Sequence, residues 1–220
     1  MSGGAAARRP WVGGALAPLL LCLPALAQAT GAPATDAPPT GRWDFTVSLD
    51  GKPIGTHRFV VTGGADARSV ESRASFVVRW LGVPVYRYRH EADERWQGNC
   101  LRELRAETET NGERQAVNER LDDGCRMGFA YWNPRLVSQS TLVNPQTGQA
   151  TPVRVERLPD ATIERLGQPV PSRGWRLRTP DQRIDVWYAT DSGRWIALDA
   201  DVDGGRRLSY RLLTTNATPP

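Results

Sequence analysis

Residues 43–61 carry the pattern that most limits the fold, because apolar residues occupy every second position at its start. These alternating residues are Trp43, Phe45, Val47 and Leu49. A period of two places apolar side chains on one face of a β-strand. The pair Asp50-Gly51 follows at once, and Asp-Gly favours two-residue hairpin turns. The sequence therefore predicts a β-hairpin with one buried face.

The rest of the body repeats this organisation. Further segments have strand composition, and most end at Gly, Pro, Asn or Asp: 69–80, 83–96, 101–110, 114–121, 151–158, 175–179, 184–189, 194–200 and 207–213. No long segment has a helical period, although 133–139 suits a short helical turn. We predict an all-β fold in which a curved antiparallel sheet forms a half-barrel or barrel, with at most one or two short helices, because a long flat sheet would leave exposed edges.

The N-terminus has the parts of a secretory signal peptide. Arg8-Arg9 precede an apolar run that ends in the small-residue triplet at 25–27. We predict a signal peptide over 1–27, cleaved at Ala27 or nearby, and export to the periplasm or the medium. Cys22 would be removed with it, and a lipid anchor is disfavoured because Leu21 stands where a lipobox needs a small residue.

Low-complexity sequence flanks the body on both sides. Residues 28–41 are rich in Pro, Ala, Thr and Gly and predict a flexible leader, and 214–220 predict a disordered tail. Between them, 42–213 are expected to form a single β domain. Outside the signal, no stretch is apolar and long enough for a transmembrane helix, so we expect no transmembrane segment after signal removal.

Two cysteines remain beyond the signal, Cys100 and Cys125. Exported proteins fold where disulfides persist, so we predict that the pair is joined. A redox-active dithiol is the alternative, but no Cys-x-x-Cys motif supports it.

Charge excludes one class of partner. Lys and Arg number 28 against 24 Asp and Glu, which gives a net charge of +4. This excess is too small for a nucleic-acid-binding surface, and the arginines are interspersed with acids. We expect no nucleic-acid partner.

Residues suited to catalysis are scarce. The two histidines, His57 and His90, lie in strand-like segments and are too few for a zinc site. Three acids in 91–94 follow His90, which we interpret as a solvated strand end. No Gly-x-Ser-x-Gly elbow occurs. We therefore predict no catalytic residue, no cofactor and no metal, and expect that the protein is not an enzyme.

Two acidic patterns have a plainer interpretation. Residues 199–204 match the first half of a calcium loop, but Tyr210 stands where the closing Glu is needed, so a hairpin turn at 203–205 is favoured. Glu107 and Glu109 share one strand face, as a catalytic carboxylate pair would. Arg105 lies on that face too, so surface ion pairs are favoured.

Several phrases together resemble a known family. They are Phe-Ala-Tyr-Trp-Asn-Pro at 129–134, Leu-Val-Asn-Pro-Gln-Thr-Gly at 142–148 and Val-Trp-Tyr at 186–188. They resemble an uncharacterised family of exported bacterial proteins known only as a domain of unknown function. More remotely, the Asp-Gly-x-x-Ile-Gly hairpin at 50–55 is similar to the lipoprotein carriers of the Lol pathway. That resemblance implies a curved half-barrel and supplies no catalytic residues.

The aromatic content suggests a function. A curved sheet with an aromatic inner face can hold an apolar ligand, although the same rings can fill a packed interior. Trp132, Asn133 and Asn144 lie in the two Asn-Pro loops and could form a pocket rim. We expect a non-enzymatic binding module for an apolar or amphiphilic envelope molecule such as a lipid. The alternative is a structural or assembly factor of the envelope that acts through protein–protein contacts.

Overall fold

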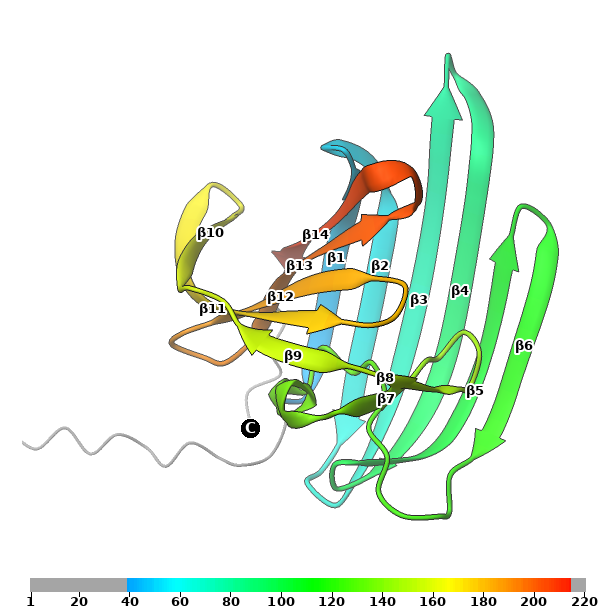
Figure 1. Ribbon diagram of the computed structural model, residues 1–220, viewed down its shortest axis with the longest axis vertical. Helices are drawn as coiled ribbons and strands as arrows, with labels where there is room; N and C mark the ends of the chain where they lie inside the picture. The colour runs from blue at the N-terminus through cyan, green and yellow to red at the C-terminus, as the bar shows by residue number, and fades with distance from the viewer. Residues whose placement is uncertain (1–38, 215–220) are drawn as a thin grey trace, which may run out of the picture. The chain divides into compact units, whose positions relative to one another are not determined.

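The computed structural model describes residues 39–214, and these form antiparallel β-structure (Figure 1). The expectations for the signal peptide, Cys22, most of the leader and residues 215–220 lie outside the described residues. The strands are β1 (Gly41–Leu49), β2 (Lys52–Gly63), β3 (Ala67–Trp80), β4 (Val83–Gln97), β5 (Cys100–Thr110), β6 (Glu113–Arg120), β7 (Thr141–Val143), β8 (Ala150–Pro152), β9 (Arg154–Arg157), β10 (Ala161–Arg165), β11 (Gln168–Arg178), β12 (Arg183–Ala189), β13 (Trp195–Val202) and β14 (Arg206–Thr214).

Twelve strands make one sheet in the order β10-β11-β12-β13-β14-β1-β2-β3-β4-β5-β6, with β9 also pairing to β11. β1 lies between β2 and β14, so the first and last strands are hydrogen-bonded neighbours. β6 and the β9–β10 side remain as edges, and the sheet does not close. The helical content of the described residues is two 3-10 turns, η1 (Pro134–Ser138) and η2 (Asp203–Gly205). The prediction of a curved all-β sheet is confirmed.

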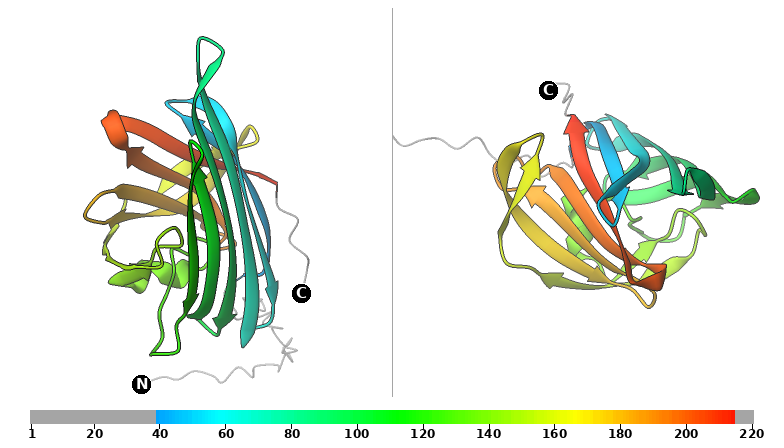
Figure 2. Two further views of the ribbon diagram at one scale, coloured as in Figure 1. Left: turned by 90° about the vertical axis from the view of Figure 1, so that its right-hand side faces the viewer. Right: turned by 90° about the horizontal axis from the view of Figure 1, so that it is seen from above.

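The curvature gives the sheet a concave and a convex face (Figure 2). The predicted alternation decides which side chains face inward: Trp43, Phe45 and Val47 have no exposed surface. Segment 121–153, which contains η1 and the small β7–β8 sheet, connects β6 to β9 along the concave side (Figure 1). Its apolar residues join the core formed by the concave face.

Four hairpin turns share one backbone geometry. The first turn residue has a positive φ at Asp50 (49°), Leu81 (48°), Asn111 (52°) and Leu166 (50°), and a glycine with positive φ follows each. Two consecutive positive φ angles define the type I′ turn, which matches the twist of the flanking strands. Asp and Asn suit this conformation, whereas Leu tolerates it poorly. The leucine turns are therefore unusual.

The sequence missed part of the β9–β11 region. β10 and the first half of β11 were not predicted, because Leu166-Gly167 does not resemble a turn and Pro169 and Pro171 disfavour a strand. β12 pairs with β11 only from Ser172 onward, so both prolines lie where β11 has a neighbour on one side. Residues 151–158, expected as one strand, are divided between β8 and β9 in different sheets. Within 39–214, no helix is both long and apolar enough to span a membrane.

Candidate functional site

A row of cross-strand partners crosses the concave face from β1 to β5: Phe45, His57, Ala74, His90 and Thr108. Directly opposed residues point to the same side of a sheet, so both imidazoles face inward. Ala74 separates them, and its small side chain leaves room for the two rings. The interpretation of His90 as part of a solvated strand end is wrong, because His90 is only 4% exposed.

His57 is held by two hydroxyl groups. Its Nε2 lies 2.7 Å from Ser72 Oγ and its Nδ1 lies 3.3 Å from Tyr210 Oη, and its ring stacks on Phe59 with centroids 4.1 Å apart. Burial, followed by the proximity of His90, lowers the pKa of His57 to about 3. The ring is therefore neutral at physiological pH and is a weak base.

The His57–Ser72 pair resembles half of a nucleophilic triad. A catalytic triad needs a carboxylate that orients the histidine and stabilises its positive charge. Here the other ring nitrogen faces the hydroxyl of Tyr210, whose pKa burial raises well above its usual value. Ser72 itself is only 5% exposed. This geometry orders the ring but gives it no partner that would support charge.

His90 is the second neutral imidazole. Its Nδ1 lies 2.8 Å from Thr108 Oγ1. Burial is the main reason that its pKa is lowered to about 4; Arg73 acts in the same direction and Glu91 opposes it. The pair His90–Thr108 is therefore a satisfied polar contact within the sheet.

An aromatic cluster continues this face toward the β3–β4 turn. Phe76 and Tyr88 are direct cross-strand partners, and their rings stack with centroids 5.2 Å apart and an interplanar angle of 10°. Phe76 also contacts His57 and Tyr210 edge-on. We call these four residues the aromatic patch. Its members His57 and Tyr88 are only half-buried, so the patch is not fully covered.

One of the two Asn-Pro loops contacts the aromatic patch. Gln146 Nε2 donates a 2.9 Å hydrogen bond to Tyr88 Oη, and the Asn144 side chain accepts from the Gln146 backbone N–H at 2.8 Å. Asn144 therefore shapes a loop that lies beside the patch. Its rim role stays a prediction, and Gln146 is a contacting residue that the sequence reasoning did not single out.

The opposite end of the concave face is filled. Trp132 packs edge-on against Trp96 with ring centroids 5.4 Å apart, and Trp132, Leu104 and Leu136 are each at most 1% exposed. Trp132 and Asn133, expected at a pocket rim, lie inside the protein instead. The reason is that segment 121–153 inserts these residues against the sheet, which a loop assignment from sequence does not reveal.

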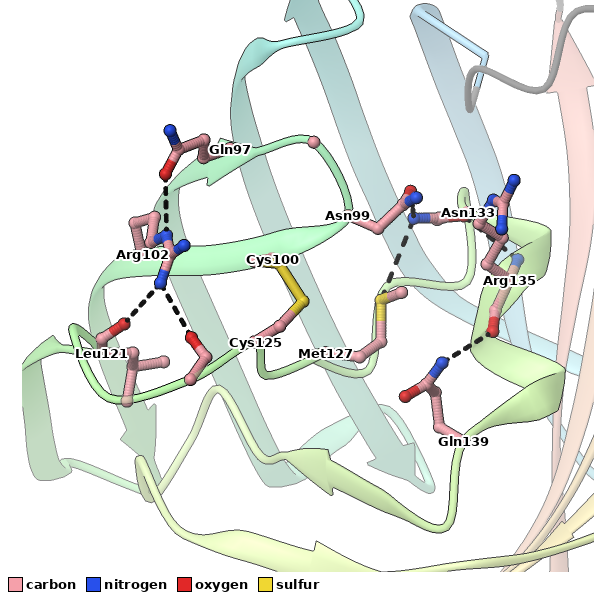
Figure 3. Close-up of a disulfide and its surroundings, with 12 residues drawn as sticks. Gln97, Asn99, Cys100, Arg102, Leu121, Cys125, Met127, Asn133, Arg135 and Gln139 are labelled. Atoms are coloured by element: carbon pink, nitrogen blue, oxygen red, sulfur yellow. Dashed lines mark hydrogen bonds between the residues drawn. A yellow bond between two sulfur atoms is a disulfide. The ribbon is translucent and has the colours of Figure 1, made fainter.

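Asn133 joins η1 to the β4–β5 turn (Figure 3). Its Nδ2 donates to Asn99 Oδ1 at 3.2 Å, while its Oδ1 accepts from the Arg135 backbone N–H at 3.1 Å and caps η1. Asn133 has no exposed surface. A buried amide with partners for both of its polar atoms fixes this loop against the sheet.

The predicted disulfide is present beside this anchor, with Cys100 and Cys125 joined and their Cα atoms 4.8 Å apart (Figure 3). It ties the start of segment 121–153 to β5. Arg102 supports the same turn by donating to the carbonyl oxygens of Leu121 and Gly124 at 3.4 and 2.8 Å.

Glu94 is a further ionisable group on the concave face. It is half-buried, and its Oε2 accepts a 2.7 Å hydrogen bond from Trp96 Nε1. Burial raises the pKa of Glu94 to about 7, although the Trp96 bond opposes that shift. A carboxyl group with this pKa changes charge near neutral pH.

One residue from each of the two acidic patterns pairs with an arginine. Asp199 accepts from Arg211 at 2.9 Å, and residues 203–205 form the turn between β13 and β14, as predicted. Glu109 pairs with Arg114 at 3.1 Å on the surface. No cluster of metal-ligating side chains occurs within 39–214.

The convex face carries an open depression of about 560 Å³ lined by charged side chains. Its acids are paired with its arginines, as in the 2.7 Å contact of Arg58 with Asp44 and the 3.7 Å contact of Arg73 with Glu91. Such pairs are solvated surface contacts. Both acids of the lining, Asp44 and Glu91, are paired in this way, while its four arginines leave the depression with an excess of positive charge.

Comparison with known protein families shows to which family the chain belongs. The family described as Domain of unknown function (DUF6134) matches residues 45–213, which run from β1 into β14. The chain belongs to this family. No curated protein matches it. The resemblance to an uncharacterised family is confirmed, whereas the remoter resemblance to the Lol lipoprotein carriers stays a prediction. The description of DUF6134 names no function.

Proposed function

We propose that this DUF6134 protein is a non-enzymatic binding module that holds an apolar or amphiphilic molecule of the cell envelope. The aromatic patch carries the proposal: four rings on a concave face contact one another, and two of them are only half-buried. Aromatic surface that solvent still reaches is favourable to cover with an apolar group. The opposite end of the concave face, by contrast, is already filled by Trp132 and its neighbours.

The polar atoms at the patch favour an amphiphile over a pure hydrocarbon. The hydroxyl of Tyr88 and the amide of Gln146 lie at its border, 2.9 Å apart. A few placed polar groups beside apolar rings fix the orientation of a ligand that has both kinds of surface. His57 and His90 are neutral, so the patch has no cationic imidazole to bind a separate anion.

Export and lack of catalysis are part of the proposal. The Arg8-Arg9 and 12–27 pattern supports export, and a disulfide of this kind persists in an oxidising compartment. The weak basicity of the two histidines supports a role in binding, because general bases work best with a pKa near the operating pH.

The test is binding of a fluorescent fatty acid to the purified exported protein, together with native mass spectrometry for a co-purifying ligand. Tyr88→Asp places a carboxylate in the aromatic patch, and we expect it to weaken binding at least tenfold. Ser75→Asp is the matched control, because Ser75 is exposed and precedes Phe76, on the other face of β3.

Equal binding by both variants would refute the patch as the site, and an empty wild-type protein that binds no fatty acid would refute the function. Melting curves accompany each variant. If Tyr88→Asp fails to fold, Tyr88→Ala serves instead, because it removes the ring without adding a charge.

A further inference from the structure

The hairpin between β3 and β4 extends beyond the neighbouring strands (Figures 1 and 2). β2 pairs with β3 only as far as Phe76, and β5 pairs with β4 only as far as Tyr88. Residues 77–87 therefore form a two-stranded projection supported by the rest of the sheet only at its base. We call residues 77–87 the β3–β4 finger.

The finger carries most of the exposed large apolar side chains within 39–214. They are Trp80 (70% exposed), Leu81 (89%), Val83 (62%), Val85 (56%) and Tyr86 (36%), and the one other such residue is Leu166. An isolated exposed apolar residue is ordinary, but a contiguous group at a projecting tip indicates an interaction surface.

Leu81, the first residue of the β3–β4 turn, also indicates an interaction surface. Leu81 has a left-handed backbone conformation, with φ of 48°. Asn111 occupies the equivalent position of the β5–β6 turn with φ of 52°, and Asn suits that conformation better. A leucine at position 81 is therefore unfavourable in two ways: its backbone conformation is left-handed and its apolar side chain is exposed to water. Neither backbone conformation nor solvation explains why this position holds a leucine.

Charge and shape indicate which surface the finger meets. Residues 76–90 contain Arg79, Arg87 and Arg89 and no acid. Arg89 is paired with Glu91 at the base, whereas Arg79 and Arg87 lie on the finger and are exposed. Apolar side chains occupy both faces of the finger and its tip. A projection that is apolar on all sides suits insertion into a soft layer better than contact with a flat protein surface. Arginines beside exposed Trp, Tyr and aliphatic groups match the phosphate and acyl layers of an anionic lipid interface.

We propose that the β3–β4 finger docks the protein on anionic lipid bilayers by inserting Trp80 and Leu81 into the interfacial layer. Insertion is shallow, because the outer edges of residues 77–86 have no strand partner and their backbone groups need water or lipid headgroups as partners. The proposal goes beyond ligand binding by the aromatic patch and does not require it.

The test is flotation of the purified full-length protein with vesicles of phosphatidylcholine, with and without phosphatidylglycerol. Leu81→Asn is the central variant. We expect it to lower the partition coefficient roughly tenfold or more, as expected for withdrawing one buried Leu from an apolar phase. We also expect it to raise the melting temperature by roughly 2 to 4 °C, because it relieves the left-handed leucine.

Leu166→Asn is the matched control, because Leu166 is 65% exposed in the same kind of turn, with φ of 50°. It should raise the melting temperature in the same way and leave vesicle binding unchanged. Replacing both Arg79 and Arg87 by Gln should weaken binding only to vesicles that contain phosphatidylglycerol, by roughly fivefold for each charge.

The proposal is overturned if wild-type protein ignores both kinds of vesicle, or if Leu81→Asn and Leu166→Asn float equally. Crosslinking of the finger to a protein in cells, without vesicle binding in vitro, would also overturn it in favour of a protein partner. Fatty-acid binding by Leu81→Asn, measured without vesicles, should match that of wild type. Failure of the patch proposal is therefore distinguishable from failure of the finger proposal.

Discussion

Acid should destabilise this protein partly through His90, and the effect can be isolated with one substitution. His90 is 4% exposed, and burial lowers its pKa from 6.5 to about 4. Between these two pH values the imidazole of His90 is protonated in the unfolded chain and neutral in the folded chain. Stability from this group is therefore complete above pH 6.5 and is lost as the pH falls toward 4. A difference of this size corresponds to about 3 kcal/mol.

His90→Gln removes the titration while keeping an amide that can bond to Thr108, the partner of His90 at 2.8 Å. Urea unfolding at about pH 7 and about pH 4.5 measures the free energy of unfolding of both proteins. We expect the wild-type protein to lose about 2 to 3 kcal/mol more than the variant between these conditions.

Two other groups on the concave face titrate in this range and are common to both proteins. The pKa of His57 is lowered to about 3, so this group, like His90, lowers the free energy of unfolding as the pH falls. Glu94 acts oppositely: its pKa is raised from 4.5 to about 7, so its folded form binds the extra proton and gains stability as the pH falls. The difference between the two proteins cancels the Glu94 contribution and the part of the His57 shift that burial causes, whereas the smaller part that His90 causes disappears with His90. An identical loss of stability in wild type and His90→Gln would refute the assignment of a buried neutral imidazole at position 90.

Further substitutions test the packing. Replacing both Cys100 and Cys125 by Ser should lower the free energy of unfolding by about 3 kcal/mol, because the bridge closes a separation of 25 residues; unchanged urea midpoints would contradict this. Trp132→Ala should cost about 3 to 5 kcal/mol in the same assay, since the ring is 1% exposed, whereas a cost below about 1 kcal/mol would return Trp132 to a surface role. Gly55→Ala should cost more than about 2 kcal/mol, because a Cβ there would lie 1.9 Å from a carbonyl oxygen of β3, while Gly64→Ala, with open space, should be nearly neutral by thermal melting.

The alternation of apolar and polar residues predicted the first six strands well, because most of them bury side chains on one face; β6 buries only Val117. Its failures have local causes. His90 is followed by acids at 91, 93 and 94, which suggested solvent. The strand period places Glu91 and Asp93 on the convex side and leaves His90 with Ala92 on the buried side. Which face the sheet buries at that point depends on its curvature, which no single strand encodes.

The position of Trp132 could not be predicted for a different reason. Segment 121–153 has little period of its own, and its burial depends on contacts far away in the sequence, such as that of Trp132 with Trp96. The disulfide was predictable because the expectation of export and an even cysteine count sufficed. The sequence pattern therefore predicted the disulfide, but it did not predict which residues of segment 121–153 join the core.

The finger and the aromatic patch share one face of the sheet. Val78 and Tyr86 are cross-strand partners on the finger, and they lie two residues from Phe76 and Tyr88, the partners in the patch. Side chains two residues apart on a strand point the same way, so apolar groups continue from the patch toward the exposed tip. Val78 and Tyr86 are both partly exposed, which leaves this path accessible. If the tip enters a lipid interface, an amphiphile could pass between bilayer and patch over apolar side chains alone. The same continuity explains why a stable hairpin would keep costly exposed leucine and tryptophan so far from the core.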